Sequence, residues 1–199
     1  TGTWRADTMN GTGEGDTPVF GAIKAAERKL VEEQDSKAYL GPEGDMGFVK
    51  ALMPYVFGKD SPDMGGRIEG MQTPGGTGSL RLALAMVKKA GYSRVIVGKP
   101  SWPNHNQICA DLGLSVYEFN HAGADGKTDM DALRGAFAQA GEGDAVLLHG
   151  CCHNPTGIDY SNAEWDEIAQ LIADTKVLPI IDLAYQGLGL GMEEDAYGL

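Results

Sequence analysis

Short apolar runs alternate with stretches of helical periodicity along the later part of this chain. In those stretches apolar residues recur at i, i+3, i+4 and i+7, which gives each helix one buried stripe. This alternation is typical of βαβ units and predicts an α/β fold, with a mostly parallel sheet and helices on both of its faces. The runs are 70–73, 94–98, 114–119, 145–149 and 177–182, and two of the stripes are Leu80, Ala83, Leu84, Val87 and Trp165, Ile168, Ala169, Ile172.

Two further helices are expected in the first third of the chain. One runs from Pro18 to Ser36 with apolar residues at helical spacing, and the other covers residues 46–57. Later in the chain, Ser161 is followed three residues on by Glu164, which is the pattern of a capping box. The capping box predicts where the last of the helices begins.

The composition is that of an ordinary soluble globular protein, with 199 residues of which 42% are hydrophobic and 22% charged. No apolar run is long enough to span a bilayer and the first residues do not form a secretion signal, so we expect a cytoplasmic protein that binds no membrane. The net charge of -12 argues against a nucleic-acid partner, because such binding needs basic residues to neutralise phosphates. A small-molecule partner is favoured instead.

Ligands of open parallel α/β sheets bind beyond the carboxyl ends of the strands, so the residues that follow each apolar run are candidates for a site. The first run leads into a glycine-rich turn with Gly75, Gly76 and Thr77, which continues into a helix. Glycines let the backbone approach a ligand, and a helix N-terminus offers free amides to an anion. The turn is a candidate phosphate cradle, although a tight turn with a helix cap explains the glycines as well.

Trp102 and His105 follow the second run. The flat indole of Trp102 can stack on a heteroaromatic ring, but a tryptophan packed in the core is the alternative. The fifth run ends in Asp182, and an acid at the end of an apolar strand needs a cation or hydrogen-bond donors. A protonated ring nitrogen meets that need, and so does a role for Asp182 in capping the next turn.

The fourth run leads into HGCCHNPTG at residues 149–157, where two histidines and two cysteines invite a zinc site. Structural zinc sites use cysteine pairs separated by a longer loop, and adjacent cysteines in an extended chain point apart. We therefore expect no metal, and we interpret the cysteines as reduced packing residues. The NPTG part is a turn in which Asn154 can offer its amide to a ligand.

Four motifs in this order resemble those of the class I, fold-type I, pyridoxal-phosphate-dependent aminotransferases, and most of all the bacterial aspartate and aromatic amino acid branch. They are QTPGGTG at 72–78, SWPNH at 101–105, HGCCHNPTG at 149–157 and DLAYQG at 182–187. The resemblance implies the large, cofactor-binding domain of that family, incomplete at both ends. It also implies an enzyme that moves an amino group between an aromatic amino acid or aspartate and a 2-oxo acid.

The resemblance assigns the cofactor ring to four residues of this chain. Asp182 would pair with the protonated pyridine nitrogen, and Tyr185 and Asn154 would hydrogen-bond the phenolic oxygen. Asp182 and Tyr185 are therefore the expected catalytic residues. Trp102 would stack on the ring, and Trp102 and Asn154 would also contact the substrate.

Other residues are assigned by the same resemblance. His105 and His149 would support Asp182, and Gly2 with Trp4 would line the substrate site. Tyr39 would reach the phosphate bound by a neighbouring subunit, which implies a homodimer with shared active sites. The phosphate itself would be held by Gly75, Gly76 and Thr77.

The resemblance also places essential groups of the family beyond residue 199. These are the lysine that forms the Schiff base, an arginine on the phosphate and an arginine on the substrate carboxylate. We thus expect residues 1–35 to lead into the large domain and residues 36–199 to form it, truncated before the lysine. Two alternatives are a non-catalytic, truncated cofactor-binding fragment and a nicotinamide-dependent dehydrogenase, which would need an acid at the end of the next strand that this sequence lacks.

Overall fold

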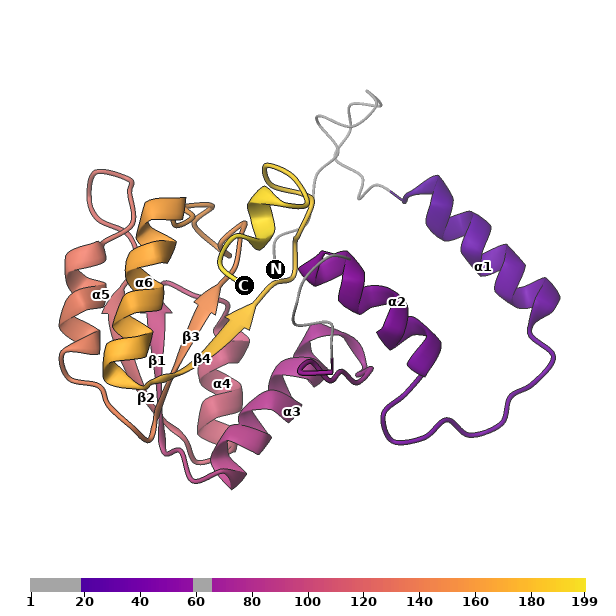
Figure 1. The fold of residues 1–199 in the computed structure, drawn as a ribbon, viewed down its shortest axis with the longest axis horizontal. Helices are drawn as coiled ribbons and strands as arrows, with labels where there is room; N and C mark the ends of the chain where they lie inside the picture. The colour runs from indigo at the N-terminus through magenta and orange to yellow at the C-terminus, as the bar shows by residue number, and fades with distance from the viewer. Residues whose placement is uncertain (1–18, 59–65) are drawn as a thin grey trace. The chain divides into compact units, whose positions relative to one another are not determined.

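The structure is a computed structural model that describes residues 19–58 and 66–199. The chain divides into two compact units, Thr1–Pro42 and Glu43–Leu199. The described part of the first unit has one helix, α1 (Gly21–Glu33), none of whose side chains is buried. The second unit contains the other described helices and strands (Figure 1). None of the helices that the structure describes is both long and apolar enough to cross a membrane.

Four strands form one parallel sheet in the second unit, in the order β2-β1-β3-β4. The next strand along the chain, β2, lies on one side of β1, and β3 lies on the other side. The strand order therefore reverses between β1 and β3. His149 at the end of β3 pairs in register with Asp182 at the end of β4. Four of the five predicted runs are confirmed as strands, to within one residue at each end: β1 (Arg94–Lys99), β2 (Ser115–Asn120), β3 (Asp144–His149) and β4 (Leu178–Asp182).

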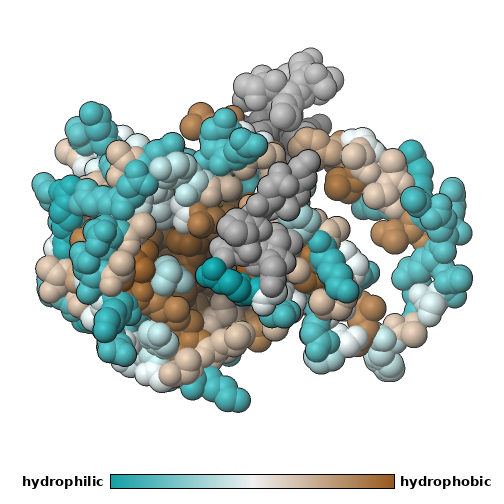
Figure 2. Space-filling view, in the orientation of Figure 1, coloured by the Kyte–Doolittle hydropathy of each residue, from teal (hydrophilic) through white to brown (hydrophobic). Residues whose placement is uncertain are grey.

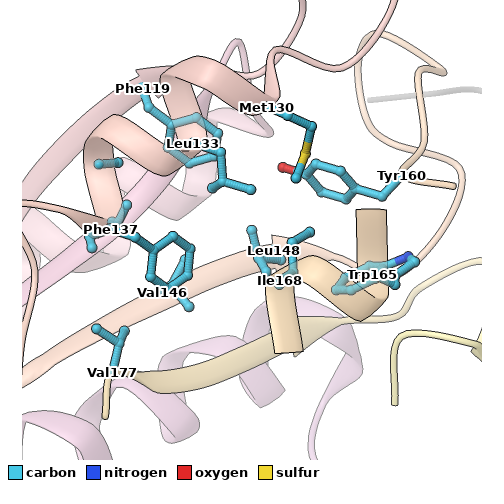
Figure 3. Close-up of a cluster of buried hydrophobic side chains, with 12 residues drawn as sticks. Phe119, Met130, Leu133, Phe137, Val146, Leu148, Tyr160, Trp165, Ile168 and Val177 are labelled. Atoms are coloured by element: carbon cyan, nitrogen blue, oxygen red, sulfur yellow. The ribbon is translucent and has the colours of Figure 1, made fainter. Parts of the chain in front are cut away.

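One face of the sheet is covered by α5 (Met130–Phe137) and α6 (Asn162–Thr175) (Figure 1). Ile96 and Val146 project from their strands into a core that includes Phe137. Figure 3 shows Val146 and Phe137 among the buried side chains of this cluster. Burying a side chain of this size contributes roughly 1.5–3 kcal/mol. The predicted stripe of α6 is confirmed at its buried residues Trp165 and Ile168, and so is its capping box.

The opposite face is covered by α3 (Gly75–Lys89) and α4 (Pro103–Asp111). Val95 and Val97, which flank Ile96 in the sequence, point to this second core because side chains alternate along a strand. The expected α/β architecture, with helices on both faces of a parallel sheet, is thus confirmed. Since α3 leads into β1 and packs against it, α3 runs antiparallel to the strands and its N-terminus lies at their carboxyl edge.

The helix expected at 46–57 is confirmed as α2 (Met46–Phe57). Asp45 caps it, because its carboxylate accepts hydrogen bonds from the amides of Gly47 at 2.8 Å and Phe48 at 3.1 Å. The end of α2 contacts the loop that follows β4, where Nε2 of Gln186 donates to the carbonyl of Val56 at 3.2 Å.

The strand expected at residues 70–73 does not form. The amide of Gln72 donates to the carbonyl of Glu43 at 2.8 Å, and its side chain accepts from the amide of Asp45 at 2.8 Å. Its bonds therefore go to the segment before α2, and no described strand lies beside it. Met71, the apolar side chain of this run, is exposed, so the segment has no buried side to pack as a strand would.

One helix boundary differs from expectation, and one helix was not expected. The first helix was expected to continue to Ser36, but α1 ends at Glu33, because Gln34 has an extended backbone. Its expected first residue, Pro18, lies outside the described residues. Sequence periodicity did not predict α4, which begins at Pro103. The available signal was the proline itself, because proline is common at the first position of a helix.

Candidate active site

The carboxyl ends of β1, β3 and β4 lie next to one another, because these strands are parallel neighbours. Strand order reverses between β1 and β3, and ligands of such sheets bind in the crevice at that point. Ser101 and Trp102 follow β1, His149 ends β3 and Asp182 ends β4. The glycine turn at the N-terminus of α3 lies at the same edge, so the fold brings all four motifs together.

Asp182 is held by His105. Its Oδ2 lies 2.9 Å from Nε2 of His105, whose side chain is fully buried, whereas that of Asp182 is 27% exposed. Oδ1 of Asp182 has no hydrogen-bond partner among the described residues. Burial would raise the pKa of Asp182, but the hydrogen bond from His105 and the neighbouring imidazoles outweigh burial and lower it. Asp182 is therefore ionised near neutral pH, with one oxygen open to a cation.

Ser101 links His105 to His149. Its Oγ lies 2.7 Å from Nδ1 of His105 and 3.1 Å from Nε2 of His149. Nε2 of His105 faces a carboxylate and so carries a proton, and in the tautomer with this single ring proton Nδ1 accepts from Ser101. Ser101 in turn accepts from His149, so all these hydrogen bonds point toward Asp182. Sequence reasoning gave Ser101 no role, although its place directly after a strand was a signal.

The glycine turn leaves the start of α3 open. Pro74 stands at the N-cap and provides no side-chain acceptor. The amide of Gly75 donates to the carbonyl of Thr73 at 2.8 Å, so the first-turn amides that lack a capping acceptor are those of Gly76 and Thr77. Gly75 has a φ of 70°, and a Cβ at Gly75 or Gly76 would meet nothing within 4 Å. Thr77 is exposed in the same turn, and Thr73 Oγ1 donates to the carbonyl of Gly75 at 3.1 Å. Open amides at a helix N-terminus suit an anion such as phosphate.

Trp102, Asn154 and Tyr185 lie half-buried in the segments that follow β1, β3 and β4. Trp102 packs against the core under α3 and α4, and its ring meets His105 edge-on with centroids 5.5 Å apart. It thus takes part in the core, as its alternative interpretation expected, while it keeps an exposed portion. The side chains of Asn154 and Tyr185 make no hydrogen bond with the described residues, which leaves them available to a ligand.

Asp159 fixes the turn that carries Asn154. Its two carboxylate oxygens accept from the amides of Cys152 and His153, both at 2.7 Å. Cys152 takes the left-handed conformation, with a φ of 48°. Burial raises the pKa of the Cys151 thiol to about 12, so this thiol stays protonated. Within the described ranges, no group of three or more His, Cys, Asp or Glu residues is placed to hold a metal ion.

Asp195 fixes the loop after β4. This buried carboxylate accepts hydrogen bonds from the amides of Gly187 at 2.9 Å, Gly189 at 2.9 Å and Leu190 at 2.8 Å. The loop it holds begins directly after Tyr185. Sequence reasoning missed Asp195, and an acid close behind a glycine-rich segment was the signal it offered.

The remaining candidates lie elsewhere in the chain. Tyr39 belongs to the first unit, where its side chain is exposed, and its expected role stays a prediction. Gly2 and Trp4 lie outside the described residues. Lys99 ends β1, but its ammonium is 3.0 Å from the carboxylate of Glu118, so it offers no free amine to the site.

A cavity of about 420 Å³ lies beside α6 and β4. Its walls are mostly apolar and include Phe57, Trp165, Ile181 and Tyr197. Figure 2 shows hydrophobic residues exposed on this side of the molecule. None of the predicted site residues lines the cavity, so the polar groups at the strand ends form a separate site.

Comparison with known proteins agrees with the motifs. Residues 10–199 match the family model described as aminotransferase class I and II. The tyrosine aminotransferase of Rhizobium meliloti (strain 1021) is 48% identical over 187 residues, which cover 93% of this chain and 47% of that protein. The aspartate aminotransferase of Escherichia coli (strain K12) is 45% identical over 188 residues, covering 93% and 48%. An aromatic-amino-acid aminotransferase from Burkholderia pseudomallei, covalently bound to pyridoxal phosphate, superposes with a TM-score of 0.88 at 30% identity, over 91% of this chain and 46% of that one.

Fold and site define a doubly wound α/β protein with a polar ligand site where the strand order reverses. The chain belongs to the aminotransferase class I and II family. The expected family is therefore confirmed, and the names of the relatives agree with the aspartate and aromatic amino acid branch. The chain spans about half the length of the curated relatives it matches.

Proposed function

We propose that the protein containing this chain is an aminotransferase, which moves an amino group between an aromatic amino acid or aspartate and a 2-oxo acid through pyridoxal phosphate. The observation that carries the proposal is the state of Asp182, an ionised carboxylate held by His105 at one oxygen and open at the other. Such a carboxylate can keep a pyridine nitrogen protonated. Membership of the family supports the same chemistry.

The turn at the start of α3 suits the phosphate of the cofactor. Gly75 shapes the turn, the amides of Gly76 and Thr77 are donors for phosphate oxygens, and the helix dipole favours the negative charge there. Thr77 adds a hydroxyl in the same turn. The turn and Asp182 lie at one edge of the sheet, so one elongated ligand with a phosphate and a ring nitrogen can use both.

The half-buried residues that follow the strands would contact the face and the phenolic oxygen of the cofactor ring. Trp102 offers its indole face for stacking, and Asn154 and Tyr185 offer an amide and a hydroxyl to the phenolic oxygen. Trp102 and Asn154 also border the space for the substrate. These roles stay proposals, and they are supported by the lack of hydrogen bonds from the Asn154 and Tyr185 side chains to any of the residues that the structure describes.

Pyridoxal phosphate, when bound, withdraws electron density from the α-carbon of the amino acid. The part of this chain in the reaction is to keep the ring nitrogen protonated through Asp182 and to donate a hydrogen bond from Tyr185. Asp182 acts without reorganisation because His105 already fixes it. The lysine and arginines expected from the family are assigned to no residue of this chain.

The proposal extends to the assembly. In a homodimer with shared active sites, Tyr39 would contact the phosphate in the neighbouring subunit, and Gly2 with Trp4 would line the substrate site. A cytoplasmic location fits the absence of a membrane-crossing helix among the described residues.

The test uses the purified full-length protein. It is mixed with pyridoxal phosphate, with phenylalanine, tyrosine or aspartate as donor and 2-oxoglutarate as acceptor, and the product 2-oxo acid is measured. We expect transfer together with a visible absorbance band of the bound cofactor. Cofactor binding without transfer would favour the non-catalytic alternative, and a protein that neither binds nor transfers would overturn the proposal.

A further inference from the structure

All four histidines of the chain lie in one row across the carboxyl edge of the sheet. His105 contacts His149 with ring centroids 5.0 Å apart, His149 contacts His153 at 4.2 Å, and His153 contacts His121 at 3.7 Å. Asp182 is at one end of this histidine row. His121, which directly follows β2, is at the other end, and the proposed function gives it and His153 no role.

His121 is fixed at both ring nitrogens. Its Nε2 lies 2.7 Å from the carbonyl oxygen of Ile158, and its Nδ1 lies 3.3 Å from the hydroxyl of Tyr160. Because a carbonyl only accepts, Nε2 carries the proton, and Nδ1 of the neutral ring accepts from Tyr160. The ring of Tyr160 is itself held in the hydrophobic core, beside Met130 in Figure 3.

The backbone around His121 leaves room for this placement. The amide of His121 donates to the carbonyl of Lys99 at 2.9 Å, which continues the pairing of β1 with β2. A Cβ at Gly98 would come within 3.1 Å of the Cβ of His121. The glycine in β1 therefore allows the close approach that brings His121 over the sheet.

His153 transmits this rigidity to His149. Its ring stacks on His121 with an angle of 6° between the planes, and its Nδ1 lies 2.8 Å from Oγ1 of Thr156. His153 is buried, so its ring can turn only if the stack opens. The ring of His149 lies against His153 with centroids 4.2 Å apart, and its Nε2 lies 3.1 Å from Oγ of Ser101.

We propose that His121 is a positioning residue, which clamps His153 against His149 and so fixes the neutral His149 ring as the donor that starts the chain through Ser101 and His105 to Asp182. Neutral rings at His149, His153 and His121 leave the negative charge of Asp182 for the cation in the site. A positive charge on His149 would compete for that carboxylate. This role for His121 rests on the proposed function only for the identity of that cation.

The surroundings of His149, His153 and His121 keep these three rings neutral. Burial first, and then the neighbouring His105, lower the pKa of His149 to about 4, although Asp182 and Asp159 act in the opposite direction. Burial also lowers the pKa of His153 to about 3 and that of His121, against the opposing charges of Asp159 and Glu164 on His121. Two charged rings in contact would repel each other strongly, so the stack itself favours neutral rings.

The test is nuclear magnetic resonance of the full-length protein with 15N-labelled histidine, recorded without cofactor. In the natural protein we expect His149 to stay a single neutral tautomer, protonated at Nε2, from pH 5.5 to 8. The lower end of this range is still ~1.5 pH units above the lowered pKa of His149. In His121→Ala the stack is lost, and we expect mixed tautomers of His149 and a protonation midpoint about one unit higher, as solvent reaches the ring. His121→Phe keeps a ring that can stack on His153 and should change His149 by less than half as much.

Tyr117→Phe is the matched control. It removes a partly buried hydroxyl from the same core, bonded to Gln139 at 3.1 Å, without touching the row. His149 signals in folded His121→Ala that coincide with those of the control over the whole pH range would overturn the inference. If His121→Ala does not fold, His121→Asn, which also lacks the ring, takes its place with the same two outcomes. Because no cofactor is present, a failure to bind pyridoxal phosphate would reject the proposed function and leave this test unaffected.

Discussion

The carboxylate of Asp182 lies 2.9 Å from the imidazole of His105, which precedes it by 77 residues in the chain. The contact joins the end of β4 to α4, across the intervening end of β3. At this contact the buried row of histidines ends on Asp182, whose other carboxylate oxygen is open to a ligand. The predictions below follow from this arrangement and from the loops that support it.

Asp182→Asn should reduce kcat for transamination about 100-fold or more, the scale seen when one preorganised electrostatic group is removed. The fold should persist, because the asparagine carbonyl can still accept from His105. Steady-state kinetics and circular dichroism measure the two effects. Asp166→Asn is the control, since Asp166 only accepts from the hydroxyl of Tyr197 at 3.0 Å on the surface of α6. Near-normal turnover in Asp182→Asn would contradict the assignment.

Tyr39 is predicted to serve the neighbouring active site. Subunits with Tyr39→Phe and subunits with Asp182→Asn should each be weak alone, whereas a mixed dimer should regain activity at the site that has both native residues. The assay mixes the two variants after dissociation and compares activity with that of each variant alone. A full-length protein that sediments as a monomer, or no recovery on mixing, would argue against shared sites.

Asp195→Asn should lower the free energy of unfolding near pH 7 by roughly 2–3 kcal/mol, because hydrogen bonds to a charged acceptor are lost. Burial opposes ionisation of Asp195, but the amides of Leu190, Gly189 and Gly187 outweigh burial and lower its pKa. A depressed carboxyl pKa stabilises the fold above the unfolded value of about 3.9, and this contribution is lost as the pH falls through the folded value.

The difference between Asp195→Asn and the natural protein should therefore be constant from about pH 5 to 7 and shrink below about pH 4. Urea denaturation at several pH values measures it. Glu193→Gln, an exposed acid in the same segment, should show no such difference. A gap that stays the same at low pH would mean that packing, and not charge, accounts for the effect.

Gly98→Ala should destabilise the protein by about 1–3 kcal/mol, as expected for overpacking. The new methyl would press on His121 and shift the far end of the histidine row. Gly135→Ala in α5 is the matched control, since a Cβ there meets nothing within 4 Å, and it should be neutral or stabilising by about 0.5–1 kcal/mol. Thermal unfolding of the two variants distinguishes them, and equal stability would count against the close contact.

Much of the fold could be predicted, because apolar runs such as 94–98 and helical stripes such as that of α6 reflect burial directly. Residues 70–73 show the limit of this reasoning. Their composition resembled a strand, but whether a segment pairs depends on a neighbouring strand, and the bonds of Gln72 go to Glu43 instead. Partner choice is a property of the whole sheet and is not encoded in a window of four residues.

The candidate site could be predicted only where a residue directly follows a strand in a recognisable motif. Ser101 and His121 also follow strands, but their partners depend on the order of strands in the sheet. Asp195 acts through backbone amides of glycines, which leave no trace in residue type. Such contacts can be identified only once the three-dimensional path of the loops is known.

The end of β4 also has a consequence for how the protein is made. The ribosome synthesises Ser101, His105 and His149 well before Asp182, and chains begin to fold from the N-terminal side as they emerge. β1, β2 and β3 can thus pack the histidines while the acid they orient is still to be translated. Asp182 is positioned only when β4 pairs with β3, so this acid is the last of the four groups to reach its place at the carboxyl edge of the sheet.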